Sequence, residues 1–228
     1  MQNPAIVQKK ATTFAVHHVQ HLSPTAFVVR FDRAGMQFKP GQYITAGIAN
    51  DLHVREYSIY SSPQDDFLEI LVKTVENGLV SRKLQGLKPG DALQVEGPFG
   101  YFLLEDQNTP VLMIATGTGI SPFHSMIQDN PALPYTLLHG VRTESENYAW
   151  DLYDPDRFVR CISQPVEKQI ESPQHFTGRV TEYLRRNPVM DPATRCYLCG
   201  NCDMIYEVFD ILQEHGIPSH QLFAEVYF

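Results

Sequence analysis

Short runs of alternating apolar and polar residues make up the N-terminal part of the chain. Such alternation is typical of strands with one buried face. Gly, Pro, Asn and Asp between the runs predict tight connections, which favours a small antiparallel barrel. The predicted strands are residues 12–19, 25–31, 41–48, 56–60, 67–72 and 92–96. Residues 78–84 break this pattern, because the spacing of their apolar positions indicates one short helix.

From Pro110 onward the pattern changes to continuous apolar runs with helical periodicity between or after them. Such runs are typical of parallel strands buried on both faces. The clearest helix is residues 204–214, with Asp203 as its predicted N-cap and Gly216 just past its end. Alternating strands and helices predict an α/β domain with a parallel sheet. The predicted strands are residues 111–115, 135–139, 158–162 and 196–199.

The polar stretch 105–109 separates the two patterns, so we place an antiparallel β-barrel domain at residues 1–106 and an α/β nucleotide-binding domain at residues 107–228. A length of 228 residues with 43% hydrophobic and 19% charged residues fits folded cores. The net charge of −8 disfavours nucleic-acid binding through general basic charge. No apolar run is long enough to span a bilayer and no signal-peptide layout is seen, so we expect a cytoplasmic protein.

Three of the four cysteines, Cys196, Cys199 and Cys202, have a C-x-x-C-x-x-C spacing that resembles part of an iron–sulfur motif. A cluster needs a fourth ligand, and Cys161 would have to supply it from a neighbouring strand. Within a strand, the odd separation of Cys196 and Cys199 points them to opposite faces, where they cannot share one metal. We therefore expect no metal site, and so few cysteines indicate a reducing compartment.

Residues 115–123, Ala-Thr-Gly-Thr-Gly-Ile-Ser-Pro-Phe, follow an apolar strand and precede a predicted helix. Gly117 and Gly119 would let backbone N–H groups approach a phosphate at this turn. Ser121 is placed to cap the helix, and Pro122 suits its first position. Pro122 also stands where the dinucleotide fingerprint has its third glycine, so an ordinary tight turn is the alternative.

Three other segments suit a phosphorylated ligand. Arg142 follows the second strand of the α/β domain, where an arginine suits a 2′-phosphate, although a solvated surface arginine is the simpler alternative. In the barrel, Arg55, Tyr57 and Ser58 provide a cation, an aromatic ring and a hydroxyl within four residues. A strand of mixed core and surface residues would look the same. Residues 78–81 open the short helix and form a second candidate anion site.

These motifs follow one another in a fixed order. They are Arg-x-Tyr-Ser at 55–58, Gly-x-x-Ser at 78–81, Gly-Asp at 90–91 with Gly-Pro-Phe-Gly at 97–100, the glycine loop at 117–123, and Cys-Gly-Asn at 199–201. From about Thr12 to Phe228 the sequence resembles the ferredoxin–NADP reductase superfamily. The short bacterial ferredoxin–NADP reductases are the most similar members, because the chain also ends Ala-Glu-Val-Tyr-Phe.

The resemblance implies a barrel that binds FAD non-covalently and an α/β domain that takes NADP(H) as substrate, with NAD(H) as an alternative. It implies that Arg55 contacts the FAD pyrophosphate, that Tyr57 stacks on the isoalloxazine and that Ser58 lies near the reactive N5. The other implied flavin-binding residues are Val72, Lys73, Gly78, Val80 and Ser81. The implied nucleotide-binding residues are Thr116, Gly117, Thr118, Gly119, Arg142 and Gly200.

The implied catalytic residues are Ser58, Cys199 and Glu225. In the resemblance, Cys199 lies beside the nicotinamide ring, and Glu225 is the acid near the flavin on a C-terminal strand that reaches back to it. A terminal aromatic residue, Tyr227 or Phe228, would cover one flavin face and move aside for nicotinamide.

One departure concerns the choice of nucleotide. Many relatives carry an arginine after the third strand of the second domain, where this chain has Gln164. A neutral amide loses the charge-assisted contact to a 2′-phosphate, so discrimination against NADH is expected to weaken. Arg142 remains, and Lys168 and Arg179 are candidates to compensate.

The expected function is hydride transfer between NADP(H) and FAD, with single electrons passing to or from a ferredoxin or flavodoxin. Basic residues of the barrel, Lys73, Arg82, Lys83 and Lys88, would meet an acidic carrier, although a solvated lysine face is an equal alternative. Three other functions stay open: a reductase of freely diffusing flavin, a non-enzymatic NAD(P)- or metal-binding regulatory module, and a subunit with its own iron–sulfur cluster. The sequence predicts no particular oligomeric state.

Overall fold

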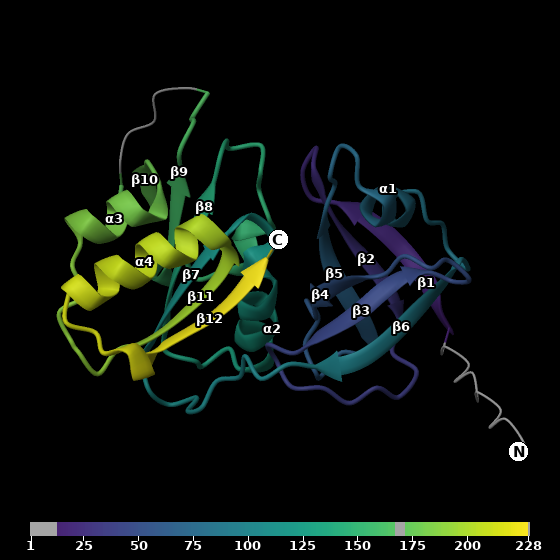
Figure 1. Cartoon of the computed structure of the whole chain (residues 1–228), viewed down its shortest axis with the longest axis horizontal. Helices are drawn as coiled ribbons and strands as arrows, with labels where there is room; N and C mark the ends of the chain where they lie inside the picture. The colour runs from purple at the N-terminus through teal and green to yellow at the C-terminus, as the bar shows by residue number, and fades with distance from the viewer. Residues whose placement is uncertain (1–12, 167–171, 228) are drawn as a thin grey trace, which may run out of the picture.

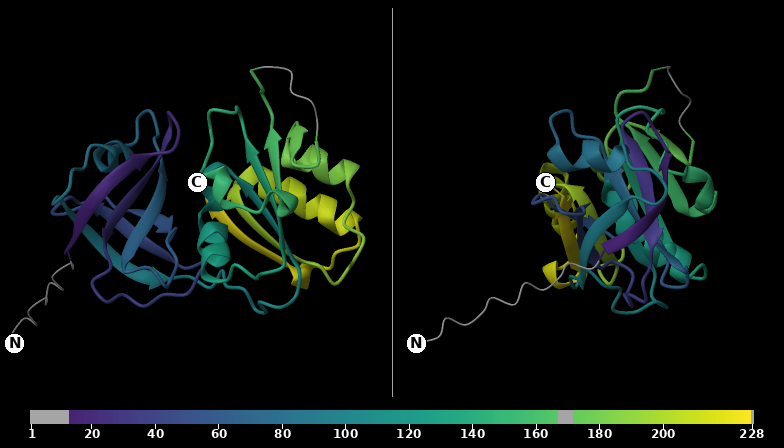
Figure 2. Two further views of the ribbon diagram at one scale, coloured as in Figure 1. Left: turned by 180° about the vertical axis from the view of Figure 1, so that it is seen from behind. Right: turned by 90° about the vertical axis from the view of Figure 1, so that its right-hand side faces the viewer.

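The computed structural model describes residues 13–166 and 172–227, which form two lobes with one six-stranded sheet each (Figure 1). Thr12, the predicted start of the first strand, lies outside the described residues. The view from behind in Figure 2 shows the same two lobes, with the chain ending between them.

The N-terminal sheet is antiparallel throughout, in the order β4-β3-β6-β1-β2-β5. A bridge between Ile59 and Ile70 joins the end of β4 to β5, so the sheet closes into the predicted barrel. Its interior is filled by alternate side chains, such as Phe27 and Val29 of β2. The elements are β1 (Thr13–His21), β2 (Ala26–Asp32), β3 (Tyr43–Ile48), β4 (Arg55–Ser58), β5 (Phe67–Lys73), α1 (Leu79–Gln85) and β6 (Ala92–Phe99).

The second sheet is parallel throughout, in the order β10-β9-β8-β7-β11-β12, which confirms the predicted α/β fold. Its strands are β7 (Val111–Thr116), β8 (Tyr135–Val141), β9 (Phe158–Ile162), β10 (His175–Thr177), β11 (Arg195–Asn201) and β12 (Leu222–Tyr227). The helices are α2 (Ser121–Asp129), α3 (Val180–Arg186) and α4 (Cys202–Glu214). Short 3-10 turns are η1 (Gly117–Ile120), η2 (Trp150–Leu152), η3 (Pro155–Arg157) and η4 (Ser219–Gln221).

Two predicted helix caps are wrong. Asn201, not Asp203, caps α4, because its side-chain oxygen accepts hydrogen bonds from the N–H groups of Asp203 and Met204. Ser121 is the first residue of α2 rather than its cap, since the 3-10 turn η1 lies between β7 and the helix. Its hydroxyl instead donates to the carbonyl of Thr118, at 2.8 Å.

One of the apolar clusters spans the interface between the two domains. Val28, Tyr60 and Leu71 of the barrel pack in the same cluster as Phe123 and Met126 of α2. Polar contacts cross the same interface: Ser125 Oγ donates to the Ser61 carbonyl at 2.7 Å, and His124 Nδ1 lies 2.8 Å from the Tyr60 carbonyl. The predicted boundary at residues 106 and 107 falls in the segment between β6 and β7.

The cysteine run does not converge on one point. Cys196 packs on the α4 side of the parallel sheet and Cys199 on the α2 side, so the predicted opposite faces are confirmed. All four cysteines are free. Across residues 13–166 and 172–227, no three His, Cys, Asp or Glu side chains are grouped to hold a metal ion. Within the same ranges, no helix combines the length and apolar character that crossing a membrane requires.

Candidate active site

A cavity of about 1440 Å³ lies where the carboxyl ends of the parallel strands face the barrel. Ligands of open α/β sheets bind outside these strand ends. The cavity is larger than the roughly 300–1,000 Å³ of a typical single-ligand pocket, so it has room for two nucleotides. The predicted residues that line it are Arg55, Tyr57, Ser58, Lys73, Gly78, Val80, Ser81, Thr116, Gly117, Thr118, Arg142, Gly200, Glu225 and Tyr227.

Four predicted site residues are placed differently. The side chain of Val72 lies in the barrel core, while its neighbours Leu71 and Lys73 line the cavity. Gly119 and Cys199 are buried behind the cavity wall. Phe228 lies outside the described residues.

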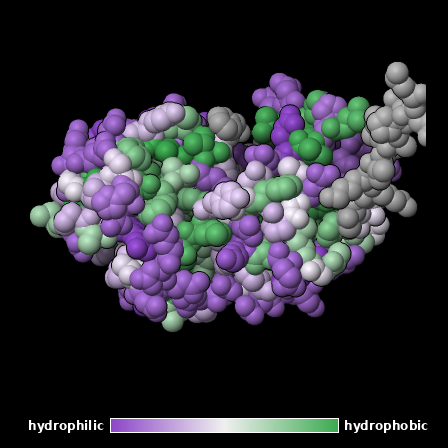
Figure 3. Space-filling view, turned by 60° about the horizontal axis from the view of Figure 1, so that its bottom comes forward, coloured by the Kyte–Doolittle hydropathy of each residue, from purple (hydrophilic) through white to green (hydrophobic). Residues whose placement is uncertain are grey.

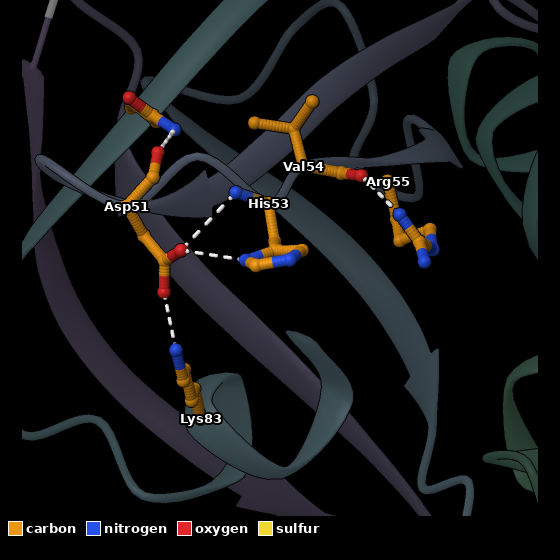
Figure 4. Close-up of polar contacts among 6 residues, drawn as sticks. Asp51, His53, Val54, Arg55 and Lys83 are labelled. Atoms are coloured by element: carbon orange, nitrogen blue, oxygen red, sulfur yellow. Dashed lines mark hydrogen bonds and ion pairs between the residues drawn. The ribbon is translucent and has the colours of Figure 1, made fainter. Parts of the chain in front are cut away.

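The edge strand β4 presents the barrel side of the cavity. The guanidinium of Arg55 is exposed and donates to the carbonyl of Val54 at 2.8 Å (Figure 4). The loop before β4 is fixed by Asp51, which accepts hydrogen bonds from Lys83 of α1 and from the backbone of His53. The Lys83 contact in particular holds the pKa of Asp51 well below its usual range. Arg55 therefore stands on an anchored loop with its charge free for an anion.

Tyr57, two residues further on, is half-buried and lines the same cavity. Burial raises the pKa of Tyr57 to about 12, although the charge of Arg55 acts in the opposite direction. The phenol is therefore neutral at physiological pH, and its ring offers a flat apolar surface to a planar ligand.

The start of α1 forms a tight cradle on the barrel side. A Cβ atom at Gly78 would lie 2.6 Å from Ser81 Oγ and 2.9 Å from Val75 Cβ, so only glycine fits there. Ser81 Oγ accepts a hydrogen bond from the Val75 N–H at 3.1 Å, which leaves its hydroxyl proton available to donate. With Arg55 and Lys73 on the same cavity, these donors fit the pyrophosphate that the sequence predicts for FAD.

One hydrogen bond joins the two domains at the centre of the cavity. Ser58 Oγ of β4 donates to Glu225 Oε2 of β12 at 2.8 Å. Burial raises the pKa of Glu225, and the nearby charge of Glu56 acts in the same direction, although the Ser58 hydroxyl favours the ionised form. The pair is the point where a group held by the barrel and a group held by the parallel sheet would meet.

Cys199 lies directly opposite Glu225 in the pairing of β11 with β12. It is fully buried, and burial raises the pKa of its thiol well above the usual range. The hydroxyl of Tyr227 is buried close to Ser58, Ser121 and Cys199, without a well-formed hydrogen bond to any described residue. Tyr227 itself lines the cavity, so it stands between the ligand space and the Cys199 thiol.

The α/β side of the cavity begins where β7 ends. Gly117 has a φ of +53°, in the left-handed region, and turns the chain from β7 into η1. Gly119 serves close packing, since a Cβ atom there would lie 2.3 Å from the Cys199 carbonyl oxygen. Gly200 likewise leaves space for Thr116 Oγ1, which would be 2.3 Å from an added Cβ. The glycines thus bring the ends of β7 and β11 together, and Gly117 and Thr118 remain on the cavity.

Both basic and acidic side chains line the far end of the cavity. Arg142, Gln164 and Arg179 line it, and so do Glu146 and Glu207. Within the described part of the chain, neither arginine forms an ion pair with its side chain. Lys168, the other candidate to compensate for Gln164, lies outside the described residues.

Sequence reasoning missed several lining residues, among them Leu71, Cys161 and Asn201. Leu71 stands two positions before Lys73 on β5, so the alternation of a strand already places both on one face. Asn201 follows the last buried residue of β11, where a cap for the next helix is expected. Cys161 gave no comparable signal, because a buried cysteine in a strand is typical of any core.

Comparison with known proteins matches both domains that form the cavity. The sequence model of the oxidoreductase FAD-binding domain matches residues 14–103, and that of the oxidoreductase NAD-binding domain matches residues 113–209. A ferredoxin–NADP reductase of Pseudomonas aeruginosa is 31% identical, with 90% of each chain covered. The fold matches that of a ferredoxin NADP⁺ reductase from Neisseria gonorrhoeae with bound FAD and NADP, at a TM-score of 0.86 and 24% identity over 96% of this chain and 99% of that one.

Other relatives are longer proteins. The electron transfer component of toluate 1,2-dioxygenase from Pseudomonas putida is 26% identical over 92% of this chain and 66% of its own length. The chain spans 66%, 58%, 64% and 58% of the first four curated relatives that it matches. The two domain matches and the ferredoxin–NADP reductase of P. aeruginosa establish that the chain belongs to the ferredoxin–NADP reductase superfamily.

Proposed function

We propose that the chain transfers hydride between NADP(H) and non-covalently bound FAD, and exchanges single electrons with a separate redox protein such as a ferredoxin or flavodoxin. The observation that carries this proposal is the hydrogen bond from Ser58 to Glu225, which joins the two nucleotide-binding domains inside one cavity. FAD, when bound, supplies the conversion between a two-electron hydride and single electrons.

The residues of this chain contribute binding, orientation and proton placement. Arg55, Lys73 and the cradle at Ser81 provide donors for the phosphates on the barrel side. Ser58 is held by Glu225 with its hydroxyl at the junction of the two domains. Tyr227 covers the junction from the β12 side and keeps water from the apolar space around Cys199.

NADPH is the proposed preferred donor over NADH. The guanidinium groups of Arg142 and Arg179, which form no ion pair with another described residue, suit a 2′-phosphate at the far end of the cavity. Gln164 adds no charge there, and the carboxylates of Glu146 and Glu207 repel an anion. We therefore expect a preference for NADPH that is weaker than a site with a third arginine would give.

The electron partner is proposed from charge and from relatives. Two relatives are described by their names as electron transfer components of dioxygenases and two as ferredoxin–NADP reductases. Of the four basic residues expected to meet an acidic carrier, Lys83 is neutralised by Asp51 and Lys73 lines the nucleotide cavity, which leaves Arg82 and Lys88. Exposed apolar side chains such as Leu52, Tyr101 and Met190 come from separate loops, and Figure 3 shows apolar and polar residues mixed on one face.

The proposed compartment is a reducing cytoplasm, because all four cysteine thiols are free.

An anaerobic absorbance titration tests the proposed function. Purified protein that retains FAD through gel filtration should be bleached by NADPH and more slowly by NADH, and should then reduce a bacterial ferredoxin or flavodoxin. The Ser58→Ala variant should retain FAD and be reduced at least about tenfold more slowly at saturating NADPH. Protein that binds no FAD, or bound flavin that neither nucleotide bleaches, would contradict the proposal. Loss of FAD on the column with activity restored by free flavin would indicate a diffusible flavin substrate.

A further inference from the structure

A buried histidine lies beneath the nucleotide loop and is used by none of the steps above. His139 belongs to β8, the neighbour of β7 in the parallel sheet (Figure 1), and is fully buried. Both of its ring nitrogens have partners. Trp150 Nε1 donates to His139 Nδ1 at 3.0 Å, and His139 Nε2 lies 2.9 Å from the carbonyl oxygen of Gly117.

These two contacts assign the tautomer of the ring. An indole N–H only donates, so Nδ1 of His139 is the acceptor and the ring proton sits on Nε2. His139 Nε2–H therefore donates to the Gly117 carbonyl. Burial lowers the pKa of His139 to about 4, so the neutral form persists at physiological pH. Tyr148 meets the ring edge-on at 5.3 Å between centroids, and Phe158 stacks at 6.4 Å, so the imidazole cannot turn freely.

The bond fixes the direction of one peptide group. In a trans peptide the C=O and the following N–H point in opposite directions. Because the Gly117 carbonyl points down to His139, the N–H of Thr118 in the same peptide group points away from His139. Gly117 and Thr118 both line the cavity. At a glycine with a φ of +53° the backbone has little steric resistance to turning, so the His139 hydrogen bond adds to the backbone of η1 in holding this orientation.

We propose that His139 is a positioning residue for nucleotide binding, which holds the Gly117–Thr118 peptide so that the Thr118 N–H faces the NAD(P) phosphates. This inference rests on the proposed function, because it takes the cavity beside Gly117 as the NAD(P) site. It predicts a contribution to nucleotide affinity from a side chain that never touches the nucleotide.

A matched pair of variants isolates the hydrogen bond. Gln and Met side chains have the same length, but only the amide of His139→Gln can donate to the Gly117 carbonyl and accept from Trp150. The FAD-bound His139→Met variant should bind NADP⁺, measured by calorimetric titration, about tenfold more weakly than His139→Gln, which should stay within about threefold of the wild type. KM for NADPH should rise in parallel in His139→Met, while the limiting rate of flavin reduction and the FAD content stay within about twofold.

A second buried histidine controls for general destabilisation. His124 lies at the domain interface, away from the cavity lining, and also contacts a backbone carbonyl. His124→Met should lower the melting temperature about as much as His139→Met and leave NADP⁺ affinity unchanged.

Equal NADP⁺ affinity in His139→Gln and His139→Met would refute the positioning role of His139 and leave the proposed function intact. So would a fall in the limiting rate with unchanged KM, or an equal loss of affinity in His124→Met. A wild-type protein that binds FAD but neither NADP⁺ nor NAD⁺ would instead refute the proposed function, and this inference with it.

Discussion

At the scale of single residues, burial determines which of the four cysteine thiols can react and which only pack in the core. Cys161, Cys196 and Cys199 are buried, and burial raises the pKa of each thiol. Cys202, at the start of α4, is the partly exposed member of the four. Their spacing groups Cys196, Cys199 and Cys202 as one motif. In the fold, however, Cys196 and Cys199 lie on opposite faces of the sheet and Cys202 lies at the start of α4.

Thiol labelling tests this distribution. Because the thiolate is the reacting species and access is required, one of the four cysteines should react rapidly with a disulfide reagent in the native protein, and all four in denaturant. A Cys202→Ser variant should lose the fast phase. Fast labelling of two or more thiols in the Cys202→Ser variant, or release of bound iron during labelling, would contradict the burial of the other three cysteines.

Nucleotide choice also depends on single residues. Replacing Arg142 by glutamine removes one unpaired guanidinium from the far end of the cavity. Since a 2′-phosphate loses a charge-assisted contact worth about 1.5–3 kcal/mol, the ratio of kcat/KM for NADPH over NADH should fall about tenfold or more. Glutamine at Arg157, which pairs with Asp154 away from the cavity, is the control and should leave the ratio unchanged. An unchanged ratio in Arg142→Gln would place the 2′-phosphate elsewhere.

At the scale of elements, hydrophobic patterning predicted the strands of the barrel from alternation and four strands of the parallel sheet from continuous apolar runs. It did not predict β10 or α3, whose three and seven residues give little periodicity to detect, and β12 was expected only from the family resemblance. The cap of α4 was misplaced because Asn201 and Asp203 are both good capping residues, and only the geometry distinguishes them. The 3-10 turn η1 was not predicted, because the position of Gly119 depends on its close contact with β11, which is distant in sequence.

The approach of β7 to β11 is therefore a testable feature of the fold. Gly119→Ala places a Cβ atom 2.3 Å from the Cys199 carbonyl oxygen, so backbone must move. We expect a loss of about 3 kcal/mol or more in the free energy of unfolding, with weaker nucleotide binding. Gly86→Ala at the end of α1 is the control, because its nearest neighbour is 3.6 Å away and its φ is −84°. Urea unfolding of both variants measures the difference, and equal stabilities would argue against the close approach.

At the scale of the whole molecule, the two domains are joined by a mixed apolar and polar interface. The ring of His124 stacks on Tyr60 with centroids 3.7 Å apart, and its Nδ1 lies beside the Tyr60 carbonyl. Burial lowers the pKa of His124 to about 4, as it does for His139 beneath the nucleotide loop. One neutral histidine thus fixes the domain interface and another the nucleotide loop, so both depend on these groups staying unprotonated.

The stability of the protein should consequently decrease in mild acid. Between pH 6.5 and about 4 the unfolded chain binds protons at both histidines while the folded protein does not, so the free energy of unfolding falls as pH falls through this window. At about 1.4 kcal/mol per unit of pKa, each histidine accounts for a loss of up to about 3 kcal/mol. Urea unfolding at pH 7.5, 5.5 and 4.5 should show this decline, and the double variant His124→Gln/His139→Gln should show a shallower one. Replacing the exposed His220 by glutamine should leave the slope unchanged, whereas parallel slopes for the wild type and the double variant would mean that other groups cause the acid sensitivity.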